Sequence, residues 1–268
     1  MSTIVTRPLI IGHRGASAVA PENTFTAFRQ AVEVGADGIE FDVRLSKDGV
    51  PVVIHDRSLE RTGRKFGLVA DCTAAELGKL DVGSWFNATY PRLARDEYSR
   101  ESVPTLMALL AQLRSFTGVI YIELKCDNDI AKLSQEVCDV IRHSGLAPQI
   151  VVKSFTLGVI PYFKIYCPAV KTAALFAPKV MRYLRKEKHL VKIATEFGAD
   201  RLSLHYSLVT GKLMKKVEKA GLPVTIWTAD NPRWVTRAQE LGIDSVITNE
   251  PARLLERRNG LAVISQTY

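Results

Sequence analysis

The segment GIEFDVRLSKDGVPVVIHD, residues 38–56, contains two apolar runs separated by a short polar turn. The first run is Gly38–Val43, the second is Pro51–His55, and the pair Asp48-Gly49 lies between them. An Asp-Gly pair in this position is a strong signal for a β-hairpin. Parallel neighbouring strands need a crossover of a dozen or more residues, so these two strands must be antiparallel. We therefore predict a hairpin arm that brings His55 back towards the carboxyl end of the first strand.

On both sides of this hairpin, apolar runs alternate with helix-like segments along the whole chain. The other predicted strands are Pro8–His13, Val119–Lys125, Ile150–Phe155, Val170–Phe176, Arg201–His205, Pro223–Trp227 and Asp244–Thr248. The predicted helices are Thr24–Val34, Leu106–Arg114, Asp129–Ser144, Lys179–Phe197, Gly211–Ala220, Pro232–Leu241 and a closing helix near Pro251–Arg258. This alternation indicates parallel strands joined by crossover helices. With the hairpin arm set aside, eight strands remain, as in a (β/α)8 TIM barrel.

The length of the chain suits a single domain. Residues 1–268 are interpreted as one barrel, since such barrels have roughly 250 residues. Between residues 57 and 103, glycines and prolines interrupt the alternation, and Trp85-Phe86 supplies a small apolar anchor. We interpret this segment as an insertion after the second barrel strand. Loops that follow barrel strands overhang the active-site face, so we expect the insertion to lie there.

The charge balance is basic, with 36 Lys and Arg against 28 Asp and Glu, for a formal net charge of +8. This excess would suit the binding of an anionic substrate, a phospholipid surface or a nucleic acid. It is equally consistent with an ordinary basic protein that binds none of these. A group of basic residues at Arg182, Arg185, Lys186, Lys188 and Lys192 is interpreted as the solvated face of a helix. No aromatic-basic pattern or known nucleic-acid-binding module is visible, so no nucleic-acid partner is expected.

The four cysteines show no C-x-x-C spacing and have apolar neighbours, which indicates free thiols in a reducing compartment. No export signal precedes the first predicted strand, and no apolar stretch approaches the length of a membrane span. We therefore expect a cytoplasmic protein without a membrane span. The sequence does not indicate an oligomeric state.

Carboxylates recur at the predicted mouth of the barrel. Glu40 and Asp42 are two residues apart on one strand, so both side chains point to the same face. Because their strand neighbours are apolar, this face must be the barrel interior, and Glu123 adds a third carboxylate from the next barrel strand. Three hard oxygen ligands favour Mg²⁺, Ca²⁺ or Mn²⁺ over Zn²⁺. The alternative is that Glu40 and Asp42 form ion pairs with Arg14, Arg44 or Lys125.

Two histidines are predicted beside these carboxylates, His13 at the end of the first strand and His55 at the end of the hairpin arm. Paired imidazoles can divide the roles of general base and general acid, as phosphodiester cleavage requires. Arg14 and Lys125 would neutralise the charge that develops on the phosphate oxygens. The remaining histidines are interpreted as structural: His143, His189 and His205.

A series of motifs extends over nearly the whole chain. In order they are HRG at 13–15, PENT at 21–24, IEFDV at 39–43, SKDG at 46–49, HD at 55–56, GSWF at 83–86, VPTL at 103–106, IELK at 122–125, KSF at 153–155, WT at 227–228 and ITN at 247–249. These motifs resemble those of the glycerophosphodiester phosphodiesterase family. The sequence departs from the pattern at Met107-Ala108 and at Asn249, positions where relatives often carry acidic residues.

The resemblance implies a (β/α)8 barrel and the metal-dependent hydrolysis of glycerophosphodiesters to an alcohol and sn-glycerol 3-phosphate. The roles it implies are acid–base catalysis by His13 and His55, phosphate contacts by Arg14 and Lys125, Mg²⁺ or Ca²⁺ binding by Glu40, Asp42 and Glu123, and packing against the glycerol or head group by Trp227. Glu22 would lie near the substrate, or else only serve the start of a helix. Direct attack by water and attack by a glycerol hydroxyl through a cyclic phosphate both remain open.

Two other functions remain as alternatives. The first is a lysophospholipase D or phospholipase type of barrel that cleaves lipid phosphodiesters, which needs an exposed apolar rim for the acyl chain. The aromatic residues available in the insertion are expected to pack its small core instead: Phe66, Trp85, Phe86 and Tyr90. The second is a catalytically silent phosphate-binding barrel, which the presence of both histidines and all three carboxylates disfavours.

Overall fold

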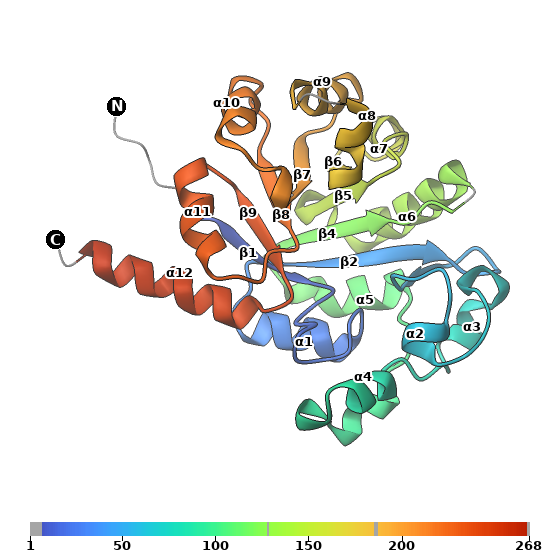
Figure 1. Ribbon diagram of the computed structural model, residues 1–268. Coiled ribbons are helices and arrows are strands. Elements are labelled where there is room, and N and C mark those ends of the chain that lie inside the picture. Colours follow the sequence, from blue (N-terminus) through green and yellow to red (C-terminus); the bar gives the residue numbers. More distant parts are fainter. Residues whose placement is uncertain (1–6, 128, 185–186, 267–268) are drawn as a thin grey trace.

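The computed structural model describes residues 7–127, 129–184 and 187–266, and these form a closed parallel barrel surrounded by helices (Figure 1). Nine strands in the described residues form one sheet in the order β1-β9-β8-β7-β6-β5-β4-β2-β3, and a β1–β2 pairing closes it. The strands are β1 Leu9–His13, β2 Gly38–Leu45, β3 Pro51–Val53, β4 Val119–Leu124, β5 Ile150–Ser154, β6 Lys171–Phe176, β7 Arg201–His205, β8 Val224–Trp227 and β9 Ser245–Thr248. Apart from β3, all are parallel, so the predicted eight-stranded barrel is confirmed.

The hairpin arm is formed as predicted. Strand β3 pairs antiparallel with β2, and Val43 lies opposite Val53. Gly49 has a φ of 79°, the left-handed conformation that glycine adopts easily in such a turn. Beyond β3, the Nε of Arg44 donates to the carbonyl oxygen of His55 at 2.8 Å. This bond holds the segment that carries His55 against β2.

The helices of the barrel lie between the strands and cover its outside (Figure 1). They are α1 Phe25–Glu33, α5 Leu106–Gln112, α6 Ile130–Ser144, α7 Val159–Tyr166, α8 Met181–Leu184, α9 Lys188–Glu196, α10 Gly211–Lys219, α11 Arg233–Leu241 and α12 Pro251–Gln266. Several begin at the side-chain oxygens that favour helix starts, at Thr24, Thr105, Asp129 and Thr210. Helix α12 closes the chain as predicted, since Arg258 Nη1 donates to the carbonyl of Pro8 at 3.2 Å.

Two helices differ from the prediction. Helix α7, with the sequence VIPYFKIY, was not predicted, because it is apolar on most faces and carries Pro161 in its first turn. The single helix predicted over Lys179–Phe197 is instead a 3₁₀ turn, Pro178–Val180, followed by α8 and α9. Of its basic residues, Arg182 and Lys188 are at least partly exposed, whereas Arg185 and Lys186 lie outside the described residues.

The segment between β3 and α5 lies below the β2 arrow, at the lower right in Figure 1. It holds three short helices, α2 Glu60–Gly63, α3 Ala74–Leu77 and α4 Ser84–Thr89, and the 3₁₀ turns Val69–Asp71, Pro91–Leu93 and Asp96–Arg100. Phe86 is fully buried and packs edge-on against Tyr98. Phe66, in contrast, is 89% exposed, so the prediction that it packs into the core of this segment was wrong.

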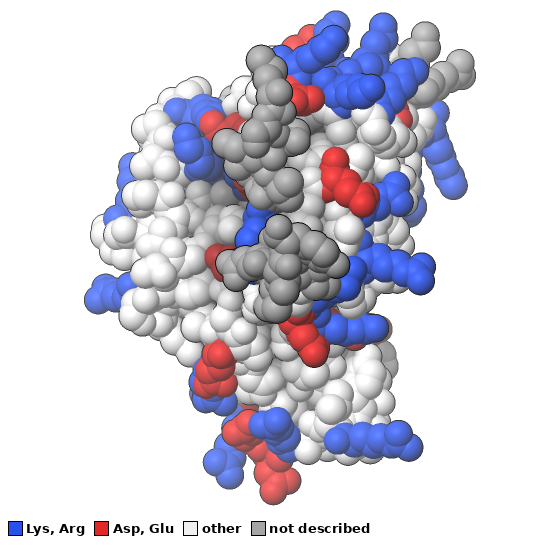
Figure 2. Space-filling model, turned by 90° about the vertical axis from the view of Figure 1, so that its left-hand side faces the viewer, with Lys and Arg blue, Asp and Glu red and all other residues white. Residues whose placement is uncertain are grey.

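The surface and the thiols agree with an ordinary basic protein. Figure 2 views the end of the barrel at which β2 and β4 begin, and Lys and Arg gather along its top, at the height of α9 and α10 in Figure 1. The four cysteines are free, as predicted. Within the described residues, no helix has the length and apolar character needed to cross a membrane. The cytoplasmic location and the lack of a nucleic-acid partner stay predictions.

Candidate active site

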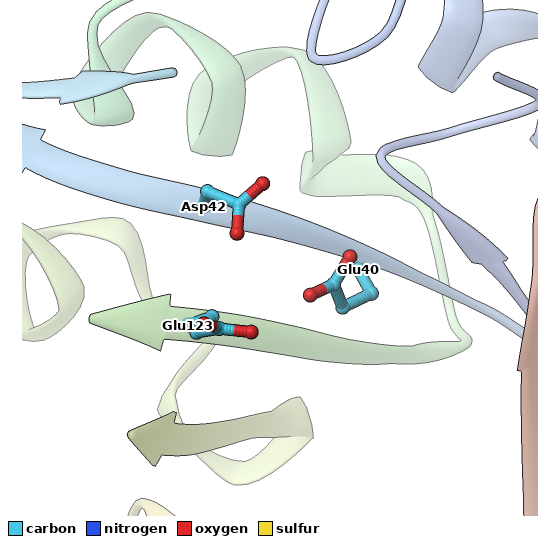
Figure 3. A group of neighbouring side chains, drawn as sticks. All are labelled: Glu40, Asp42 and Glu123. Atoms are coloured by element: carbon cyan, nitrogen blue, oxygen red, sulfur yellow. The ribbon is translucent and has the colours of Figure 1, made fainter. Parts of the chain in front are cut away.

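Three buried carboxylates meet inside the barrel. Glu40 and Asp42 come from β2 and Glu123 from β4, and the pairing of these strands places Asp42 opposite Glu123. Their side chains turn towards one another (Figure 3), and one oxygen of each lies within 4.8 Å of the others. Since Ca²⁺ binds oxygen at about 2.3–2.6 Å, one cation can reach all three groups. The geometry therefore fits the predicted cation ligands.

Two basic residues predicted for the site also contact this cluster. Lys125 Nζ lies 3.0 Å from Asp42 Oδ1 and also pairs with Glu123. Arg14 Nε lies 3.1 Å from Asp42 Oδ2, although the two atoms are not aligned for a hydrogen bond. Arg14 and Lys125 thus form the ion pairs of the alternative interpretation, and the three carboxylates still lie close enough together to bind one cation. Arg44 does not take part, because its guanidinium pairs with Asp127 at 2.6 Å.

A third basic residue, Lys153 on β5, lies in the cluster and was not among the predicted site residues. Its Nζ is 2.8 Å from Glu40 Oε1 and 3.3 Å from Glu123 Oε2, and its side chain is 2% exposed. Burial opposes the charge on this amine, but Glu40 and Glu123 outweigh it and raise the pKa of Lys153. A lysine in the apolar run IVVKS was the signal available in the sequence, because its side chain must point either into the barrel or into the helix layer.

Glu40 and Asp42 are held in their charged forms. Burial alone would raise the pKa of Asp42, but Arg14 and Lys125 hold it well below its usual range. The pKa of Glu40 is likewise lowered despite its burial, chiefly by Lys153. Glu40 Oε1 and Asp42 Oδ1 are buried and face the ammonium groups of Lys153 and Lys125. Buried anionic oxygens of this kind are suited to binding a hard cation.

His13 lies at the end of β1 with its ring nitrogens in different surroundings. Its Nδ1 is 2.6 Å from Asn249 Oδ1, while Asn249 Nδ2 donates to Asp230 at 2.8 Å and so fixes the orientation of the amide. Because Asn249 Oδ1 can only accept, Nδ1 of His13 carries the proton and Nε2 has a free lone pair. Burial lowers the pKa of His13 in spite of the nearby Glu40, so the ring is a neutral base near neutral pH.

His55 has a different partner. Its Nδ1 is 2.6 Å from Asp56 Oδ1, and the other oxygen of Asp56 accepts from Arg61 Nε at 2.5 Å. A carboxylate beside the ring fixes its orientation. The side chain of His55 is 32% exposed, compared with 15% for His13. His55 therefore has a charged partner, Asp56, whereas His13 has a neutral one, Asn249.

Glu22 lies between two arginines. It accepts from Arg14 Nη1 at 2.7 Å and from both terminal nitrogens of Arg61 at 2.7 Å each. Thr24 caps α1 through the amide of Ala27, so Glu22 does not serve the start of the helix. The side chain of Glu22 thus orients Arg14 towards the cluster.

The turn after His13 depends on Gly15. Arg14 has a φ of 53°, and its amide donates to Glu40 Oε2 at 3.2 Å. Gly15 follows with a φ of 84°, and a Cβ at this position would lie 2.5 Å from the backbone carbon of Ala27. Only glycine fits this approach of the turn to α1.

We expect Gly15→Ala to lower the free energy of unfolding by about 2–4 kcal/mol, because a left-handed alanine and a backbone clash each cost energy. Urea denaturation measures the change. Gly198→Ala is the matched control, since Gly198 has a φ of 75° and a Cβ there would meet nothing within 4 Å. It should lose only about 1–2 kcal/mol. If Gly15→Ala and Gly198→Ala lose the same free energy of unfolding, the predicted clash with Ala27 is wrong.

Trp227 lies at the end of β8, and an aromatic group surrounds it. Its ring centroid is 5.7 Å from that of Phe155 and 5.3 Å from that of His205, which also stacks on Tyr206. The indole Nε1 is buried without an acceptor among the described residues. No hydrogen bond or ion pair found in the described residues joins Trp227 to the carboxylates. Most of the other predicted site residues form one connected network: Arg14, Glu22, Glu40, Asp42, His55, Glu123 and Lys125. His13 lies beside this network, with its Nε2 3.9 Å from Glu40 Oε2.

Comparison with known proteins decides the family. Residues 13–253 match the glycerophosphoryl diester phosphodiesterase family. The chain belongs to this family. YhdW of Bacillus subtilis, a putative glycerophosphodiester phosphodiesterase, is 33% identical over 242 residues, which cover 90% of this chain and 94% of YhdW. A glycerophosphodiester phosphodiesterase of Caldanaerobacter subterraneus is 30% identical over 93% of this chain and 97% of its own length.

Solved structures of glycerophosphoryl diester phosphodiesterases and related phosphodiesterases share the barrel. An Oleispira antarctica phosphodiesterase, solved in complex with the product sn-glycerol-3-phosphate, superposes with a TM-score of 0.82 at 25% identity, covering 94% of this chain and 97% of that one. The resemblance stated from the sequence motifs, and with it the assignment to this family of enzymes, is confirmed.

Proposed function

We propose that this chain hydrolyses soluble glycerophosphodiesters to an alcohol and sn-glycerol 3-phosphate with the help of a divalent cation. The observation that carries the proposal is the buried cluster of Glu40, Asp42 and Glu123, with His13 and His55 at its edge. The product bound in the related Oleispira enzyme supports the choice of substrate class. The cation, held by the three carboxylates, would stabilise negative charge on the phosphate oxygens.

Arg14 and Lys125 would bind the phosphate. Both are largely buried, with 16% and 14% of their side chains exposed, and both already contact Asp42. A guanidinium and an ammonium at one mouth can bind a phosphodiester and the extra charge of its transition state. Glu22 would act through Arg14 rather than touch the substrate, because its oxygens are taken by two arginines. Trp227 would pack against the glycerol or head-group side of the pocket.

The two histidines would have separate roles. His13, neutral and with a free lone pair on Nε2, would accept a proton from water or from the glycerol hydroxyl next to the phosphate. His55, supported by Asp56, would give a proton to the departing alcohol. A cyclic glycerol phosphate found in single-turnover experiments would indicate attack by the hydroxyl, and its absence would indicate direct attack by water.

The pH profile should reflect the lowered pKa of His13. The base form is the active one, so kcat/KM should fall as the pH drops through this pKa, below the ordinary value of 6.5. Glu40 and Asp42 remain ionised over this range because their pKa values are lowered too. Initial rates at saturating Ca²⁺ in a non-chelating buffer measure the profile. An acidic limb with its midpoint above 6.5 would rule out a neutral, buried His13 as the base.

Initial rates on glycerophosphocholine and lysophosphatidylcholine test the substrate class. We expect the soluble diester to be the better substrate by kcat/KM. The lipid alternative has one observation in its favour, the exposure of Phe66 and, to a lesser degree, of Tyr90 and Phe155. If lysophosphatidylcholine is preferred and Phe66→Ser removes that preference, the enzyme acts on lipids instead.

A further inference from the structure

Lys153 is a fully buried ammonium group to which the proposed reaction gives no step. Lys125 reaches the mouth of the barrel with 14% of its side chain exposed, whereas Lys153 is 2% exposed. Lys153 spans two of the three carboxylates, with its Nζ 2.8 Å from Glu40 Oε1 and 3.3 Å from Glu123 Oε2. It therefore contacts the atoms that would hold a cation, and the strand register places it level with Asp42 and Glu123, one step deeper in the barrel than Lys125.

The three carboxylates of the cluster have cationic partners without any metal ion. Among the described residues they contact Arg14, Lys125 and Lys153, and Arg14 also pairs with Glu22. A divalent cation would therefore enter a cluster whose carboxylates already have partners, and it would lie close to the ammonium of Lys153. Repulsion between like charges at such separations is strong in a buried site. Removing one of the three positive charges must reduce this repulsion.

We propose that Lys153 is an internal counter-ion of the cation site: it holds Glu40 and Glu123 in place before a divalent cation binds, and it weakens the binding of that cation. This inference rests on the proposed cation site. Lys153 is a positioning residue and does not touch the substrate. The cation takes over part of the charge compensation that the ammonium provides, so the two compete for the same oxygens.

Calorimetric titration of the chelator-treated full chain with Ca²⁺ alone, and with Mg²⁺ alone, tests the proposal. Lys153→Met removes the charge while keeping an unbranched apolar side chain of similar length. Lys164→Met is the matched control, because Lys164 on α7 pairs with Asp200 outside the cluster. We expect Lys153→Met to bind Ca²⁺ at least about tenfold more tightly than the wild type, and the control to be unchanged.

Thermal unfolding gives a second readout that does not depend on activity. Without a cation, Lys153→Met should melt below the wild type, because Glu40 and Glu123 lose their counter-ion, and Ca²⁺ should raise its Tm by more than it raises that of the wild type. A variant that folds only with Ca²⁺ would support the same conclusion. If Lys153→Met does not fold even with Ca²⁺, the same titration is made on Lys153→Gln.

Equal or weaker Ca²⁺ binding by a folded Lys153 variant would overturn the proposal, and so would failure of both variants to fold in the presence of Ca²⁺. These results differ from a failure of the proposed function. If the wild type, the control and the variant all fail to bind Ca²⁺ and Mg²⁺, the cation site itself is wrong. If the wild type binds and the variant gains nothing, only the role of Lys153 is wrong.

Discussion

Replacing His13 by alanine is expected to lower kcat on glycerophosphocholine by about 10²–10⁴-fold, the range that removal of a general base or acid typically produces. The ring is positioned for this role by Asn249, which fixes the proton on Nδ1 and leaves Nε2 free. KM should change much less, because Arg14 and Lys125, the proposed phosphate-binding residues, are left in place. Initial rates at saturating Ca²⁺, measured over a range of substrate concentrations, separate the two effects.

His143→Ala is the control for this experiment. His143 lies on α6, outside the barrel, and its Nδ1 contacts the carbonyl of Asp139. We expect its kcat to match that of the wild type. A fall of less than about tenfold in His13→Ala, with the control unchanged, would remove His13 from the chemistry.

The second large effect is expected for Glu40→Gln. The substitution removes a proposed cation ligand and leaves the buried ammonium of Lys153 with Glu123 as its remaining ion-pair partner among the described residues. Removing one partner of a buried ion pair typically lowers the free energy of unfolding by about 3–5 kcal/mol. Because Lys153 keeps its contact with Glu123, we expect this variant to lose about 3 kcal/mol. We also expect Ca²⁺ binding to become undetectable by calorimetry. Urea denaturation and titration with Ca²⁺ measure the two losses.

Glu196→Gln is the corresponding surface control. Glu196 pairs with Lys192 one turn earlier on α9, and both side chains are more than half exposed. Exposed pairs of this kind contribute little to stability, so this variant should unfold like the wild type. If Glu40→Gln is as stable as the control and still binds Ca²⁺, the carboxylate cluster is not the cation site.

The barrel could be predicted from the sequence because its signals are local. The Asp48-Gly49 turn and the apolar runs placed all nine strands to within two residues of their observed ends. Helix α7 could not be found in the same way, because its apolar residues leave no polar face to reveal a helical period. The turn at Glu187, just before α9, was also missed, since the basic residues around it suit a continuous helix equally well.

The sequence identified most residues of the site but not the residues that contact them. Carboxylates at alternate positions of a strand reveal a shared face, and that rule found Glu40 and Asp42. The partner of His13 is Asn249, 236 residues further along the chain, and only the closure of the barrel brings the two together. Lys153 was overlooked as a site residue for a similar reason, because its charge is explained only by carboxylates on other strands.

A ³¹P NMR time course of glycerophosphocholine with the wild-type chain tests cation-dependent hydrolysis most directly, first after treatment with EDTA and then after Ca²⁺ or Mg²⁺ is restored. We expect no change in the diester signal with chelator and the appearance of sn-glycerol 3-phosphate once the cation is added. Hydrolysis that continues unchanged in EDTA, or no hydrolysis by a folded chain shown to bind Ca²⁺, would contradict the proposed function.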